Sequence, residues 1–162
     1  MTTAHPDQRA VPCRVLTPAG FLEATFHVAL KSNLVDMLNR GDALFRLTQA
    51  RLPTTPEPLP FFALERSAAV LVAPQGGHEQ PPTPPHGALK NHHTWWLLHG
   101  GAVVEGTLTL LHGVRVSDHL LHRTGFVVLK DAVLRVAGKE NVALGPWVAL
   151  QSASAIGASE TE

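Results

Sequence analysis

The feature that most constrains this chain is an internal repeat. A shift of 82 positions pairs residues 21–52 with 103–134 without a gap, and a shift of 86 pairs 61–64 with 147–150. The first block contains seven identities: Glu23/Glu105, Thr25/Thr107, Asp36/Asp118, Leu38/Leu120, Leu47/Leu129, Ala50/Ala132 and Leu52/Leu134. Because apolar positions also match between the copies, the repeat predicts two copies of one small structural unit.

A proline-rich segment separates the two copies. Nine of the thirteen prolines lie between Pro53 and Pro85, four of them in a loop of the first copy and five in the segment between the copies. Proline cannot donate a backbone hydrogen bond to a sheet. We therefore expect an exposed linker between the units. The expected boundaries are 11–73 for the first unit, 74–93 for the linker and 94–157 for the second unit, with flexible tails at 1–10 and 158–162.

Each copy has the sequence pattern of a mainly β unit. Apolar and polar residues alternate over 21–30 and 102–111, as in strands that bury one face. The spacing of apolar residues changes to four over 33–40 and 115–123, which predicts two short helices. The expected order in each copy is β-β-α-β-β(β), with the third strands at 44–52 and 126–136.

That order, with a glycine-closed hairpin and a long bent second strand, resembles the Sm-like fold, a small and strongly bent five-stranded barrel. The stretch Gly101–Leu108 is similar to the hairpin of that family, with Gly106 where the strand bends, and Phe126–Ala132 resembles its third strand. The resemblance covers residues 95–157 and, more faintly, 13–73. It implies two small tandem barrels. A single pseudo-twofold sandwich built from both copies is the alternative.

The sequence departs from the family in the segments that contact RNA in its RNA-binding members. Members that bind RNA present an Asp-x-x-x-Asn-type loop before the third strand and an Arg-Gly-type turn between the last two strands. The corresponding segments here are 117–125 and 151–154, and neither motif is carried over. The string Arg115–Leu120 also resembles an Arg-Leu-Ser-Asp-x-Leu pattern of small uncharacterised bacterial domains, a likeness that implies no function.

The charge of the chain gives little support to nucleic-acid binding. Charged residues are 16% of the sequence, against about 25% in typical domains, and the formal net charge is zero. Neutralising phosphates supplies much of the affinity of proteins for nucleic acids. A basic patch hidden in this balance would draw on Arg40, Arg46, Arg51 and Arg66.

The sequence also suggests a compartment. The single cysteine, Cys13, excludes an intramolecular disulfide, and the polar N-terminal residues lack the pattern of a secretion signal. No apolar run reaches the roughly 18 residues that would span a bilayer. We therefore expect a cytoplasmic protein that does not enter the membrane.

Asp36 and Asp118 occupy equivalent places near the start of the two expected helices. An acidic residue in a first helical turn interacts favourably with the helix dipole and can accept hydrogen bonds from backbone amides there. We assign both residues a structural helix-capping role. Arg115, three residues before Asp118, could form an ion pair with it, but the first copy has Asn33 at that place.

Aromatic and histidine residues in the second copy are candidates for interaction. His119 and His122 lie three positions apart on the expected helix, but they lack the further ligands that a zinc site needs, so we expect no metal. Trp95 and Trp96 would anchor a partner if they were exposed. The candidate interaction residues are Trp95, Trp96, Arg115, His119 and His122.

No catalytic residues can be assigned, because the sequence offers no nucleophile in an identifiable setting with a base and no phosphate-binding glycine motif. We therefore expect a non-enzymatic binding or assembly protein, a scaffold or adaptor without a cofactor, that binds a protein partner or associates with itself. The alternative is an RNA or single-stranded DNA binding protein. A small-molecule enzyme is the third hypothesis.

Overall fold

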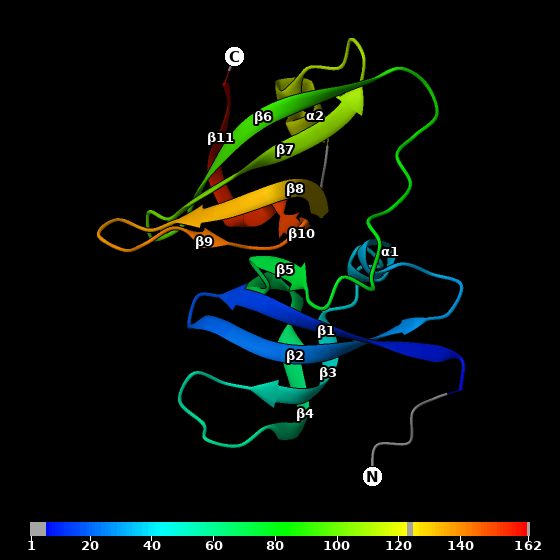
Figure 1. Cartoon of the computed structure of the whole chain (residues 1–162), viewed down its shortest axis with the longest axis vertical. Coiled ribbons are helices and arrows are strands. Elements are labelled where there is room, and N and C mark those ends of the chain that lie inside the picture. The colour runs from blue at the N-terminus through cyan, green and yellow to red at the C-terminus, as the bar shows by residue number, and fades with distance from the viewer. Residues whose placement is uncertain (1–5, 123–124, 162) are drawn as a thin grey trace. The chain divides into compact units, whose positions relative to one another are not determined.

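The computed structural model describes residues 6–122 and 125–161, and the side chains of 121 and 122 are not described. The chain forms two compact units, Met1–Pro81 and Pro82–Glu162. Both consist mainly of β-strands (Figure 1), which confirms the expectation of a mainly β chain.

Unit 1 is an open, bent antiparallel sheet with one short helix. Its strands follow the order β5-β1-β2-β3-β4, so the last strand returns to pair with the first. The long β1–β2 hairpin is drawn in blue in Figure 1. The elements are β1 (Gln8–Thr17), β2 (Gly20–Ala29), α1 (Leu34–Leu38), β3 (Leu44–Arg51), β4 (Leu59–Glu65), the 3-10 turn Arg66–Ala68 and β5 (Leu71–Pro74).

Unit 2 repeats this arrangement. Its strands follow the order β11-β6-β7-β8-β10, and the short strand β9 pairs with β8. The elements are β6 (Leu89–Leu98), β7 (Val103–Leu111), α2 (Val116–His122), β8 (Phe126–Arg135), β9 (Val142–Ala143), β10 (Trp147–Gln151), the 3-10 turn Ser152–Ser154 and β11 (Ala155–Thr161). The last strand again pairs with the first strand of the unit.

Alternation of side chains builds the core of each unit. In β2 the buried residues are Leu22, Ala24, Phe26 and Val28, and the residues between them face outward. In β7 the buried apolar residues are Val104, Leu108 and Leu110. Period-two alternation gives each sheet one face for the core and one face for solvent, as the sequence predicts.

The same β-bulge bends both sheets. The register shifts between Glu23 and Thr25 where β2 pairs with β3, and between Glu105 and Thr107 where β7 pairs with β8. Opposite these shifts, Gln49 has φ of 50° and Asp131 has φ of 52°. An extra residue in one strand increases the local bend and twist, so each bulge marks where its sheet curves.

The element boundaries differ from the expected ones at three places. Strand β1 begins at Gln8, within the expected tail, and β6 begins at Leu89, within the expected linker. Strand β11 runs to Thr161, where the sequence suggested a second tail. Main-chain pairing with a neighbouring strand extends each of these segments, and such pairing leaves little trace in local composition. Residues 1–5 and 162 of the expected tails, and Arg123 of the second expected helix, lie outside the described residues.

Candidate functional site

The helix-capping residue of α1 is Asn33 rather than Asp36. The Asn33 side chain accepts a hydrogen bond of 2.9 Å from the Asp36 amide, and the Asn33 Nδ2 group donates one of 2.9 Å to Asp36 Oδ2. Asparagine is among the preferred N-cap residues. Asp36 therefore lies in the first turn as the partner of the cap, and its contacts are structural.

Asp118 lies in the first turn of α2. In the described part of the chain, no ion pair joins its carboxylate to Arg115. Arg115 is exposed, and its carbonyl accepts the His119 amide at 3.0 Å as the helix begins. Both side chains face solvent, so the structure does not gather them into a site.

The two adjacent tryptophans point to opposite faces of β6. Trp96 is buried, and its Nε1 donates to Thr94 Oγ1 at 2.8 Å. It therefore belongs to the core of unit 2, and the suggestion that it contacts a partner is wrong for the folded unit. Trp95 is half-buried on the outward face. Only Trp95 of the pair stays a candidate for interaction.

Trp95 belongs to a polar cluster centred on Glu105. Arg135 donates to Glu105 Oε2 from Nε at 2.7 Å and from Nη2 at 2.6 Å, and His93 Nε2 lies 2.7 Å from Glu105 Oε1. The guanidinium of Arg135 lies 5.2 Å from the centre of the Trp95 ring, within the range of a cation–π contact. These four side chains come from β6, β7 and β8 and share the outward face of the sheet.

The cluster changes the acidity of Glu105. Burial raises the pKa of this carboxyl, but the hydrogen bonds from Arg135 and His93 and their charges outweigh burial, so the pKa lies below its usual value. Glu105 is therefore ionised at neutral pH. Sequence reasoning did not single out this residue, although its identity with Glu23 in the repeat was a signal for it.

The histidines of α2 do not form a metal centre with described residues. His119 is partly buried, and the side chain of His122 lies outside the described part of the structure. Among the residues that are described, no group of three or more His, Cys, Asp or Glu side chains could hold a metal ion. The described residues therefore give no metal site that includes His119 and His122.

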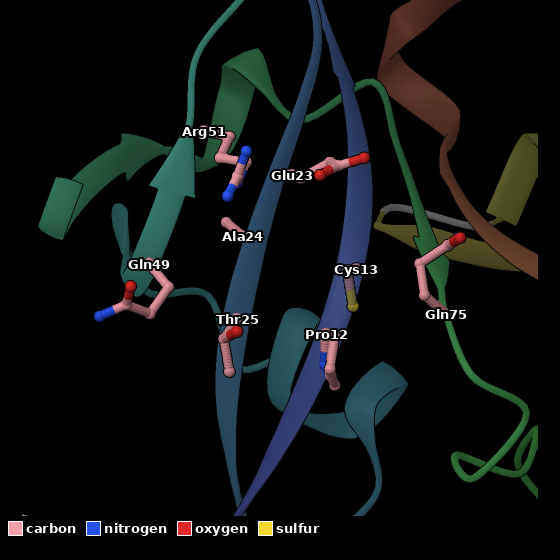
Figure 2. A pocket seen from close by; sticks show the side chains of 8 residues that line it. All are labelled: Pro12, Cys13, Glu23, Ala24, Thr25, Gln49, Arg51 and Gln75. Carbon is pink, nitrogen blue, oxygen red and sulfur yellow. The ribbon is translucent and has the colours of Figure 1, made fainter. Parts of the chain in front are cut away.

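Unit 1 has a shallow depression of about 330 Å³ beside its bulge (Figure 2). Glu23 and Arg51 face each other in the strand register, but Figure 2 shows that their side chains do not point toward one another. Both are exposed. The lining residues are Pro12, Cys13, Glu23, Ala24, Thr25, Gln49, Arg51 and Gln75. An open, polar depression of this kind lacks the enclosed apolar walls typical of small-molecule sites.

Cys13 beside this depression is unsuited to nucleophilic chemistry. Its side chain is buried, and burial, with a smaller contribution from the charge of Glu79, raises the pKa of the thiol far above its usual value. The thiolate is the reactive form of cysteine. Cys13 is therefore a core residue of β1.

Exposed apolar side chains lie beside two edge strands. Strand β4 ends the sheet of unit 1, where Phe61 is 60% exposed and Leu44 on β3 is 50% exposed. Strand β11 ends the sheet of unit 2, where Ile156 is 57% exposed and Leu97 on β6 is 40% exposed. Apolar side chains next to open sheet edges favour association with another chain.

Comparison of the chain with protein-family models, with curated proteins and with solved structures found no match. Among the residues that the structure describes, no helix combines the length and the apolar character needed to cross a membrane.

Proposed function

We propose that this protein is a non-catalytic binding or assembly protein, built by duplication of one Sm-like unit, whose sheet edges pair with a protein partner or with a second copy. The observation that carries the proposal is the exposure of Phe61 on edge strand β4 and of Ile156 on edge strand β11. An edge strand presents unpaired backbone groups, so an extended strand of another chain can add to it.

Shared irregularities support the duplication. The two units have the same strand order, and their helices begin at Leu34 and Val116, which are 82 positions apart. Gln49 and Asp131, also 82 apart, both have positive φ. Non-glycine residues with positive φ are uncommon, so their recurrence at one register position favours a common origin. The return of each last strand to the first is in keeping with a five-stranded Sm-like unit.

Charged substitutions at the edge strands test the proposal. The variants Phe61→Lys on β4 and Ile156→Lys on β11 add charge to the exposed apolar sites, whereas Leu30→Lys, also at an exposed leucine, lies outside both edge strands. We expect light scattering to show a fixed oligomer, or affinity capture to recover a defined protein, that is lost with an edge variant and kept with Leu30→Lys. A monodisperse monomer that captures nothing would contradict the proposal.

We also propose that the protein is located in the cytoplasm. Cys13 is the one cysteine of the chain, and its buried thiol lies in the core of unit 1. A chain whose fold depends on no disulfide is suited to a reducing compartment.

Binding of single-stranded RNA or DNA is the second candidate function. Arg46 and Arg51 support it, because both are exposed on β3. Arg66 supports it less, since its Nε donates to the Leu38 carbonyl at 3.1 Å. If this function holds, a labelled single strand should bind at low salt, and Arg46→Ala with Arg51→Ala should weaken binding and its salt dependence. Absence of binding at low salt would remove this candidate.

A further inference from the structure

One edge of β1 is only half covered by its neighbouring strand. Strand β5 pairs with β1 from Leu16↔Leu71 to Cys13↔Pro74. The N-terminal half of β1, Gln8–Pro12, pairs with β2 on its other side. An uncovered strand edge is a site for pairing with another chain. Strand β5 leaves the edge of Gln8–Pro12 without a neighbouring strand.

The chain that follows β5 runs along this part of β1. The Gln75 amide donates to the Pro12 carbonyl at 2.8 Å, which continues the pairing one step beyond β5. Four residues later, Glu79 reaches Arg9. We name residues 75–79 the edge guard, because their contacts advance along β1 from Pro12 to Arg9.

Glu79 fastens the edge guard through three hydrogen bonds. Its carboxylate accepts from Arg9 Nε at 3.0 Å and from Arg9 Nη2 at 2.6 Å, and it accepts from the Leu34 amide at 3.1 Å. The Glu79 side chain is only 6% exposed. Charge-assisted bidentate contacts of this kind are among the stronger hydrogen bonds in proteins.

The contact joins three elements of unit 1. Leu34 is the first residue of α1, and Arg9 also donates from Nη1 to the Ala29 carbonyl at the end of β2 at 2.8 Å. The Glu79 carboxylate therefore holds the edge guard, the start of β1 and the start of α1 together. Because the N-terminus of a helix carries unsatisfied amides, the carboxylate also completes the cap that Asn33 begins.

We propose that the Glu79 contact closes the N-terminal edge of β1 and that its release exposes Gln8–Pro12 as a further pairing edge. This inference rests on the proposed function, since the exposed edge would serve assembly. It also assigns the first part of the proline-rich segment to unit 1 and leaves 82–88 as the connection to β6. The boundary between the units after Pro81 agrees with this division.

Hydrogen–deuterium exchange of the full chain tests the inference. Glu79→Gln removes the charge and keeps the shape of the side chain, and Glu57→Gln, at an exposed glutamate in the loop before β4, is the matched control. We expect Glu79→Gln to speed exchange at the Gln75 amide, which donates to the Pro12 carbonyl, and at the Leu34 amide, which donates to Glu79, by about tenfold or more, because local opening controls exchange there. Exchange in β3 should keep its wild-type rate, and Glu57→Gln should change none of these segments.

Wild-type exchange at Gln75 and Leu34 in Glu79→Gln would overturn the inference. Arg9→Gln removes the partner of the same contact, and it should reproduce the effect if Glu79→Gln fails to fold. Light scattering of the same samples separates the two proposals. Faster exchange together with greater association supports both the closure of the β1 edge by Glu79 and the role of this edge in assembly. Faster exchange without any change in association supports the closure and contradicts the role in assembly.

Discussion

Glu105 is held by Arg135 and His93 on the outward face of unit 2, with its side chain 16% exposed. Because the pKa of Glu105 in the folded chain is below its unfolded value, the ionised carboxylate stabilises the fold at pH values above about 4.3. This stabilisation is lost as the pH falls through the folded pKa.

We predict that Glu105→Gln lowers the free energy of unfolding near neutral pH by about 0.5 to 1 kcal/mol, a range set by the solvent exposure of its partners Arg135 and His93. The difference between the variant and the wild type should shrink as the pH falls below about 4.3. Urea unfolding at a series of pH values measures it. A difference that does not change with pH would show that the carboxylate acts through packing alone.

For single residues, the sequence predicts positions in the strands and helices more readily than contacts between side chains. Adjacent residues of a strand point to opposite faces, so only one of Trp95 and Trp96 could face outward, and strand alternation is sufficient to separate them. Glu79 gave no local signal, because it lies in a proline-rich segment and its partner Arg9 is 70 positions away. Contacts of this range depend on how the strands pair, which composition does not encode.

Gly106 lies opposite the bulge of unit 2, where the sheet bends. A Cβ added at Gly106 would lie 3.1 Å from Leu129 Cβ and 3.4 Å from Ala132 Cβ. The equivalent residue in unit 1 is Ala24, which is buried. Strand β2 therefore accommodates the methyl group of Ala24 at the bulge of unit 1, whereas the space beside Gly106 on β7 is tighter.

We predict that Gly106→Val destabilises unit 2 by about 1 to 3 kcal/mol, because the branched side chain overpacks the bend. Gly106→Ala should cost less, since the neighbouring side chains need to move only by a few tenths of an ångström. Chemical denaturation followed by Trp fluorescence measures both, because the three tryptophans, Trp95, Trp96 and Trp147, all lie in unit 2. Equal stability of Gly106→Val and the wild type would contradict a crowded bend.

At the scale of elements, the expected strands and helices lie close to the observed ones, because hydrophobic periodicity sets both. The change from period two to a spacing of four placed α1 and α2 correctly relative to β3 and β8. Strand ends were harder to predict. Residues Leu89–His93 are polar in part and follow the prolines, yet they pair with β7 along their whole length, and β9 arises only because it pairs with β8.

For the whole molecule, we propose assembly with other proteins through the sheet edges. The proposal rests on two units with the same strand order and on exposed apolar side chains beside β4 and β11. A sequence can suggest a repeat, but the open edges become visible only when the strands are ordered.

The most direct measurement is affinity capture of the tagged protein from its native lysate, with and without nuclease, for the wild type, Phe61→Lys and Leu30→Lys. We predict a defined protein, or further copies of the chain, that survives nuclease, is lost with Phe61→Lys and is retained with Leu30→Lys. Recovery of RNA or DNA, with every protein partner lost after nuclease treatment, would contradict assembly through the sheet edges and favour nucleic-acid binding.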